Sequence, residues 1–100
     1  QRSPGSDRHR TALTMAASIA NESHDYARAL ELTAASLGFA KPAESAQTAA
    51  WAQLERARAL IGLHRGAEAR PLLATARASY AGLDMAERVH QADELLRLAH

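Results

Sequence analysis

The chain of 100 residues has the length of one domain, and it contains 25 alanines and 13 leucines but only four aromatic residues and one valine. This composition favours helices over strands, because β-branched and aromatic residues are the ones that favour sheets. The net charge of +1 excludes a chain that binds polyelectrolytes through its overall charge. Because there is no cysteine, a disulfide framework and a thiolate metal site are excluded. No apolar run reaches the ~20 residues that a bilayer span needs.

Two helices are expected in the first part of the chain. Residues 1–6 contain Ser, Pro and Gly and are expected to form a flexible lead-in. A first helix over about 7–21 follows, and Ser23 is a good N-cap for a second helix over about 24–38. Gly38 is expected to end that helix as a left-handed C-cap. The apolar stripe of the first helix consists of Leu13, Ala16, Ala17 and Ala20.

Three more helices are expected in the remainder. A third helix over about 42–63 is predicted to start near Pro42, because proline is suited to a first helical position. A fourth helix runs over about 67–82, and Asp84 is expected to cap a fifth over about 85–99. Connections of a few residues predict that neighbouring helices are antiparallel.

An internal repeat relates two segments that lie forty residues apart. Residues 24–32 have the sequence HDYARALEL, and residues 64–72 have the sequence HRGAEARPL. Each segment follows an Ala-rich helical pattern and opens another. A period in this range predicts an array of helical repeats, and such arrays mostly bind other molecules.

These residues resemble tetratricopeptide-like helical hairpin repeats. Ala29 and Ala69 match the small residue that packs against the preceding helix after the turn, and Ala17 and Ala57 match the small residue midway along the first helix. Residues 66–83, followed by a final Ala/Leu-rich helix, are similar to the C-terminal arrays of large bacterial regulators. These include LuxR-type activators and the antibiotic regulatory proteins of actinomycetes.

The fold expected from the pattern and the resemblance is all-α. About five helices would form antiparallel hairpins that stack as a right-handed, tetratricopeptide-like superhelix. The repeat domain would cover residues 7–100, with a hairpin at 7–38, a hairpin at 42–82 and a capping helix at 84–99. The last helix would cover the apolar side of the second hairpin, as a terminal repeat must.

No catalytic or metal-binding constellation is evident. The chain has no Gly-x-Ser-x-Gly elbow and no phosphate-binding glycine loop, so we expect no enzyme and no cofactor. His90 with Asp93 and Glu94 has the spacing of half a metal site, but no second such pair follows, so a solvated helix surface and no metal are expected. His24 and His64 occupy equivalent positions and are expected to be turn residues.

The candidate site is a groove lined by the first helix of each hairpin. Trp51 is either a core anchor or an exposed anchor for a partner, because tryptophan and arginine dominate interface hot spots. The expected partner contacts are Trp51, Glu55 and Arg58 on the third helix, with Thr14 and Ser18 on the first. The groove is expected to receive an extended peptide or a helix.

The function expected from these observations is protein–protein interaction by a non-catalytic module. The resemblance implies the C-terminal part of a larger bacterial transcriptional regulator in the cytoplasm, with no membrane partner. The alternative is a small-molecule-sensing regulatory domain, which a cavity of roughly 300–1,000 Å³ would support. The chain is not expected to bind nucleic acid directly, although its parent protein could, so a nucleic-acid surface is a third and weaker option. Its candidate residues are Arg56, Arg58, Arg65, Arg70 and Arg77.

Overall fold

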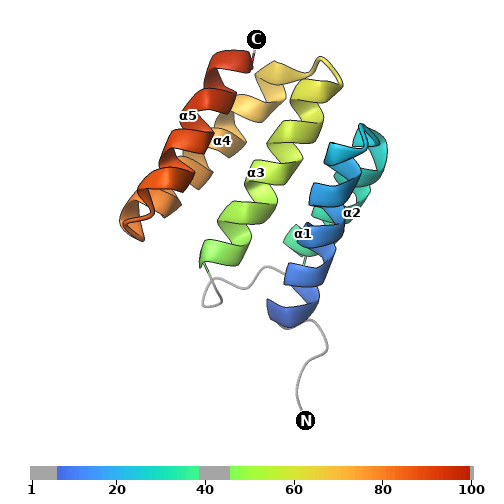
Figure 1. The fold of residues 1–100 in the computed structure, drawn as a ribbon, viewed down its shortest axis with the longest axis horizontal. Coiled ribbons are helices and arrows are strands. Elements are labelled where there is room, and N and C mark those ends of the chain that lie inside the picture. The colour runs from blue at the N-terminus through green and yellow to red at the C-terminus, as the bar shows by residue number, and fades with distance from the viewer. Residues whose placement is uncertain (1–6, 39–45, 100) are drawn as a thin grey trace.

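The computed structural model describes residues 7–38 and 46–99, and within these ranges the chain is all-helical (Figure 1). The five helices are α1 (Asp7–Glu22), α2 (Tyr26–Gly38), α3 (Ala46–Gly62), α4 (Gly66–Gly82) and α5 (Ala86–Leu98). The all-α class and the five helices expected from the sequence are confirmed. The expected lead-in at residues 1–6 and the expected helix start at Pro42 lie outside the described residues.

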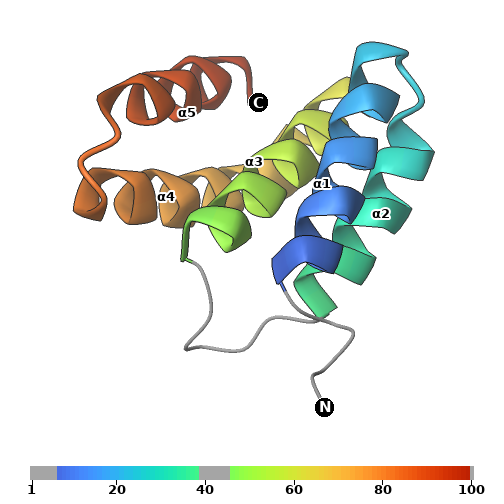
Figure 2. The same cartoon turned by 60° about the horizontal axis from the view of Figure 1, so that its bottom comes forward.

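The central element is α3, which packs against each of the other four helices. The pair α1–α2 lies on one side of it and the pair α4–α5 on the other (Figures 1 and 2). In Figure 1, α1 lies in front of α2 and α5 lies in front of α4. The right-handed superhelical stacking expected from the resemblance stays a prediction.

Three short turns of equal geometry connect the helices within the pairs and join α3 to α4. The middle residue of each turn has a left-handed backbone, with φ of 63° at His24, 63° at His64 and 62° at Asp84. The next backbone N–H donates to a carbonyl five residues earlier. These bonds are Asp25 to Ala20 at 2.7 Å, Arg65 to Leu60 at 2.7 Å and Met85 to Tyr80 at 2.9 Å. This Schellman closure satisfies carbonyls at the helix end and reverses the chain direction.

Residues other than glycine occupy these left-handed positions. The observed helix ends correct three details of the sequence prediction. Gly38 is the last residue of its helix and has no positive φ. Ser23 does not cap the second helix; Asp25 does, because its Oδ1 accepts a backbone N–H from the first turn of α2 at 3.3 Å. Asp84 lies in the left-handed position of the turn after α4 and does not cap α5, whose N-cap is Met85 and has no side-chain cap bond.

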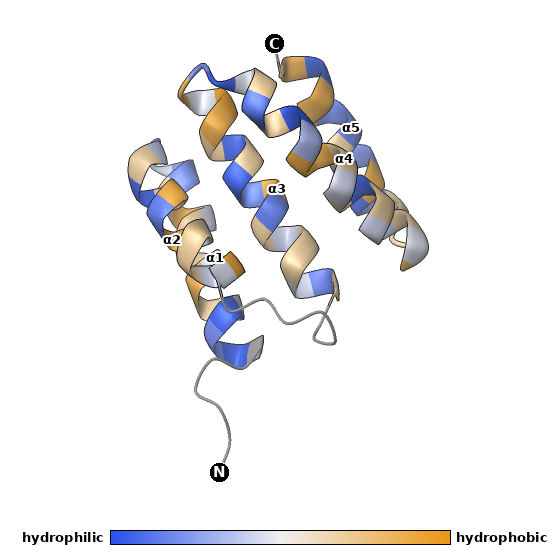
Figure 3. Ribbon diagram, turned by 180° about the vertical axis from the view of Figure 1, so that it is seen from behind, coloured by the Kyte–Doolittle hydropathy of each residue, from blue (hydrophilic) through white to orange (hydrophobic). Residues whose placement is uncertain are grey.

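The core is built from small side chains. Among residues 7–38 and 46–99, eleven of the fifteen buried apolar residues are alanine, so helices can approach closely but each residue buries little apolar area. One cluster joins α3, α4 and α5 around Leu54, Leu60 and Leu73, and another joins α1, α2 and α3 around Ala17 and Ala29. Figure 3 shows hydrophilic residues along the middle of α3 as well. On this helix the side chain of Glu55 is buried, so the central helix carries a charged group into the interior.

Candidate functional site

One face of the molecule is formed by α1, α3 and α5, and we call it the three-helix face (Figures 1 and 2). Two hollows open on it, and each is lined by residues from all three helices. A network of polar side chains lies between the hollows on α1 and α3. The network and the two hollows together form the candidate site.

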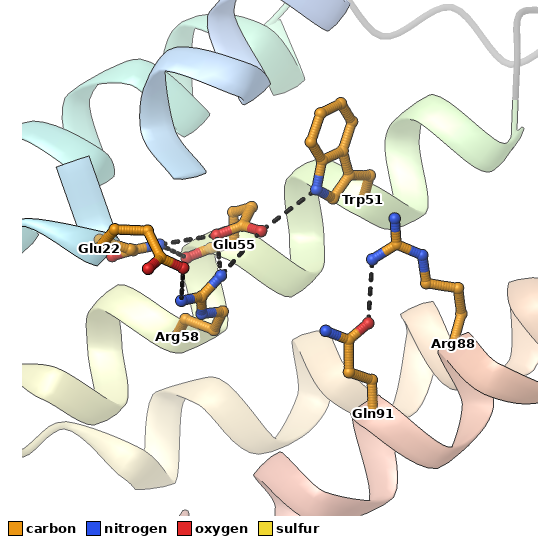
Figure 4. A network of polar contacts seen from close by, with 7 residues as sticks. Glu22, Trp51, Glu55, Arg58, Arg88 and Gln91 are labelled. Atoms are coloured by element: carbon orange, nitrogen blue, oxygen red, sulfur yellow. Dashed lines mark hydrogen bonds and ion pairs between the residues drawn. The ribbon is translucent and has the colours of Figure 1, made fainter. Parts of the chain in front are cut away.

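Glu55 is the centre of the polar network (Figure 4). It is only 2% exposed, and its carboxylate accepts bonds from Asn21 Nδ2 at 2.9 Å, from Trp51 Nε1 at 3.2 Å and from an Arg58 guanidinium nitrogen at 3.0 Å. Arg58 also contacts Glu22 at 3.3 Å. A buried carboxylate requires such partners, because without them its desolvation would be costly. The network therefore fixes α1 against α3 and orients the indole of Trp51.

Asn21 has one oxygen that the network leaves without a partner. Its Nδ2 donates both to the Glu55 carboxylate and to the Glu55 main-chain carbonyl, each at 2.9 Å. Only an NH₂ group can donate to two acceptors, so this orientation of the amide is settled by its partners. The amide oxygen is consequently a buried acceptor with no hydrogen-bond partner among the described residues.

The first hollow, which we call the Arg58 hollow, has a volume of about 240 Å³. It lies over the ends of α1 and α3 that lead into their turns. Its lining includes Asn21 and Glu22 from α1, Arg58 and Ile61 from α3, and Leu95 from α5. The lining thus combines a cationic side chain, an amide side chain whose oxygen is buried, and apolar side chains.

The second hollow, which we call the Trp51 hollow, has a volume of about 320 Å³. It is lined by Thr11 from α1, by Gln47, Thr48 and Trp51 from α3, by Tyr80 from α4 and by Arg88 from α5. Tyr80 is 1% exposed, and its hydroxyl is buried without a hydrogen-bond partner among the described residues. Burial raises the pKa of Tyr80, so the hydroxyl is protonated at neutral pH and can donate.

The structure brings three of the five predicted contact residues together. Trp51 and Arg58 line the two hollows, and Glu55 joins them from below the surface. Because Glu55 is buried, it orients its neighbours and is not itself an exposed contact. Ser18 is half-buried on α1 and lines neither hollow.

Thr14 has a position that does not fit the expected contact role. It is fully buried, its hydroxyl donates to the Arg10 carbonyl at 2.9 Å, and it shares a 2.9 Å hydrogen bond with the Ser36 hydroxyl on α2. Thr14 therefore connects α1 to α2 inside the hairpin. The sequence pattern assigns Thr14 to the wrong face, because the pattern does not show which side of α1 meets α2.

Sequence reasoning misses Asn21, Tyr80 and Arg88 as site residues. The sequence around Asn21 indicates a helix break, although Asn21 is the next-to-last residue of α1. Tyr80 fits an apolar stripe, but a buried tyrosine brings a hydroxyl that needs a partner, and that signal is present in the sequence. Arg88 carries no local signal, since only the packing of α5 brings it to α3.

Each of the five arginines proposed for nucleic-acid binding has an intramolecular acceptor. Two bind main-chain carbonyls across helix interfaces: Arg56 reaches Leu30 O at 2.9 Å, and Arg70 reaches Ala99 O at 2.8 Å. The other three bind carboxylates, and these are Arg58 with Glu55, Arg65 with Glu68 and Arg77 with Asp93. Arg65 pairs locally at the start of α4, whereas the other four arginines also reach groups outside their own helices, so the five do not form one set of unpaired cations.

His90, Asp93 and Glu94 of α5 form ion pairs on the helix surface. His90 lies 3.4 Å from Glu94, and Asp93 pairs with Arg77 of α4 at 2.6 Å. Within residues 7–38 and 46–99, no group of three or more His, Cys, Asp and Glu side chains is placed to hold a metal ion. In the same ranges, no helix has both the length and the apolar character that crossing a bilayer requires.

Comparison of the chain with protein-family models, with curated proteins and with solved structures finds no match in any of the three.

Proposed function

We infer that this chain is a non-catalytic interaction module that binds a protein partner, as an extended peptide or a helix, on the three-helix face. The observation that carries this proposal is the pairing of two hollows on one face. Each hollow is lined by an arginine and by a residue that carries a buried polar atom without a hydrogen-bond partner among the described residues. These residues are Asn21 with its Oδ1 in one hollow and Tyr80 with its Oη in the other.

Buried polar atoms without partners favour a binding role for this face. An unsatisfied buried donor or acceptor costs about 1–3 kcal/mol, and most buried polar atoms in folded proteins have a partner. A peptide brings both N–H donors, which suit Asn21 Oδ1, and acceptor oxygens, which suit Tyr80 Oη. A partner that supplies these groups recovers the cost on binding.

The two ends of the helix stack differ in a way that supports a place at the C-terminal end of a larger tetratricopeptide-like array, as in a bacterial regulator of the cytoplasm. The outward stripe of α1 is apolar, with Met15 52% and Ile19 63% exposed. The exposed side of α5 is mostly polar and includes Glu87, His90 and Glu94, with Leu98 as its exposed large apolar residue in the last turn. A further hairpin would stack on the apolar end, whereas a polar outer face is typical of a terminal repeat.

A small-molecule-sensing domain is the second candidate function. The larger hollow has about 320 Å³, which lies at the lower limit of the range for ligand pockets. This volume suits one side chain of a peptide better than a drug-sized ligand. We therefore place the peptide-binding function first.

A selection experiment tests the proposal directly. Peptides selected from a random library on the immobilised chain would be titrated into isotope-labelled protein, and amide chemical shifts would be followed. We expect the perturbed amides to gather on α1, α3 and α5. Trp51→Ala should weaken binding at least tenfold, because truncation of a central tryptophan commonly costs about 2 kcal/mol or more.

A matched control is the Arg65→Ala variant, which removes an exposed ion pair with Glu68 away from both hollows. It should bind the selected peptides like the unmodified chain. Shifts confined to the outer surfaces of α2 and α4, or equal affinity of the Trp51→Ala variant, would contradict the proposed function.

A further inference from the structure

The Trp51 hollow has a composition that selects for one kind of chemical group. Its lining includes the cationic residue Arg88, the hydroxyl-bearing residues Thr11 and Tyr80, and the aromatic residue Trp51. No Asp or Glu side chain of the described residues is part of that lining. The hollow therefore offers hydrogen-bond donors and a positive charge beside an aromatic surface.

Arg88 differs from the paired arginines of this chain. The hydrogen bond that the structure gives it is a 2.9 Å bond to the neutral amide oxygen of Gln91, and among the described residues no carboxylate lies within ion-pair distance of it (Figure 4). In Figure 4 its guanidinium lies on the side of α5 that faces Trp51. A guanidinium has five N–H donors in a planar fork, so most of its bonding capacity stays available.

Tyr80 is the second observation, and it is independent of Arg88. It comes from α4, it is 1% exposed, and its hydroxyl has no partner among the described residues. The charged groups that act on this phenol are Arg88 and Glu55, and the Glu55 carboxylate is already occupied by Trp51 and Arg58. A buried protonated hydroxyl next to a cation is suited to donate to an oxyanion.

We propose that the Trp51 hollow binds the carboxylate of an acidic side chain, Glu or Asp, of a partner peptide. Arg88 provides the charge-assisted bonds, Tyr80 donates its hydroxyl, and the indole of Trp51 packs on the aliphatic part of the side chain. This assignment rests on the peptide-binding function proposed above. The volume of about 320 Å³ holds one side chain with its flanking backbone.

Trp51 is the only tryptophan of the chain, so its fluorescence reports occupancy of the hollow. Three probes would be titrated at constant ionic strength. These are acetyl-Ala-Ala-Glu-Ala-Ala-amide, the same peptide with Gln in place of Glu, and sodium acetate. We expect a saturable change with the Glu peptide, at least tenfold weaker binding of the Gln peptide, and weaker binding of acetate than of the Glu peptide.

Two variants separate binding from folding. Arg88→Gln should lower the affinity for the Glu peptide at least tenfold. Arg97→Gln removes an exposed guanidinium elsewhere on α5 and should leave the affinity for the Glu peptide unchanged. Tyr80→Phe should weaken binding several-fold without lowering the melting temperature, because it removes a hydroxyl that has no partner among the described residues. A lowered melting temperature with unchanged binding would overturn the role given to Tyr80.

The remaining outcomes distinguish this assignment from the function on which it rests. Equal binding of the Glu and Gln peptides, or unchanged affinity in Arg88→Gln, overturns the acidic site even when library-selected peptides still bind the three-helix face. Acetate could instead bind with the same affinity as the Glu peptide and lose that affinity in Arg88→Gln. This outcome would support a carboxylate site that takes free acids. That result overturns the peptide as its source and removes the support for peptide binding.

Discussion

The three left-handed turn positions are occupied by His24, His64 and Asp84. A left-handed backbone costs an L-residue with a Cβ about 1–2 kcal/mol, and glycine avoids this cost. The Schellman hydrogen bonds impose the conformation on whichever residue falls at that place. These positions therefore hold strain that single substitutions can remove.

Replacing His64 with glycine should stabilise the chain. We expect His64→Gly to raise the free energy of unfolding by about 0.5–1 kcal/mol, which is the relief of strain minus the entropy that glycine adds to the unfolded chain. Urea unfolding followed by circular dichroism measures this. His64→Ala is the control and should change little, because alanine keeps the Cβ. A fall in stability for the glycine variant would show that the imidazole contributes more than the strain costs.

Gly62 is the glycine whose missing side chain leaves room for a neighbour. A Cβ at this position would lie 2.5 Å from the ring of Tyr26, whereas a Cβ at Gly82 would have no atom within 4 Å. We expect Gly62→Ala to lower the free energy of unfolding by about 1–3 kcal/mol through overpacking, and Gly82→Ala to raise it by about 0.5 kcal/mol. Thermal unfolding of both variants gives the comparison.

The Tyr26→Ala background provides the control for this prediction. Without the phenol ring, alanine at position 62 has no clash, so the two substitutions should be strongly non-additive. Additive effects would mean that the cost arises elsewhere than at the Tyr26 ring.

At the scale of elements, an ion pair between Arg77 and Asp93 links α4 to α5. The hydrogen bond from Arg77 holds the pKa of Asp93 below its ordinary value of 3.8. Because the folded-state pKa is lowered, the contribution to stability is present above the ordinary pKa and is lost as the pH falls through the folded-state value. Both side chains are partly exposed, so the contribution is small.

The pH dependence of this pair can be measured with Arg77→Gln. The variant should melt at a lower temperature than the unmodified chain at pH 7, and the difference should shrink below about pH 4 as Asp93 takes up its proton. In an Asp93→Asn background, Arg77→Gln should show no pH-dependent effect. A difference that grows toward acid pH would mean that Arg77 does not stabilise the ionised form of Asp93.

At the scale of the whole molecule, α3 holds the two helix pairs together. It contacts all four other helices, and within the described residues α1–α2 and α4–α5 meet mainly through it. Besides the apolar contacts, two hydrogen bonds from Asn21 connect α1 to Glu55 of α3. Opening of either pair therefore leaves α3 packed against the other.

This arrangement predicts the order of hydrogen exchange. Amides in the middle of α3 should exchange most slowly, because they open only in global unfolding, while amides of α1 and α5 should exchange faster through opening of one pair. Native-state exchange measured by NMR at low denaturant concentrations tests this order. Slowest exchange in α5 would mean that the α4–α5 pair, and not α3, is the most stable unit.

Helix segments and turns differ in how well the sequence predicts them. The helix segments are predictable because Ala- and Leu-rich periodic patterns are local, and the fourth helix, expected at 67–82, lies at Gly66–Gly82. The repeat of residues 24–32 at 64–72 locates two of the three equivalent turns. The third, at Asp84, escapes the prediction although Gly62-Leu63 and Gly82-Leu83 repeat at half the period.

The helical class, the number of helices and the interest of Trp51 and Arg58 are predictable from the amino-acid sequence, because each depends on neighbours within a few positions along the chain. The packing of the helices buries Thr14 and Glu55, and it brings Tyr80 and Arg88 to the same hollow as Trp51 from three different helices. Which face of an alanine-rich helix turns inward is set by packing against partners distant in sequence, since alanine is small enough to be placed on any side.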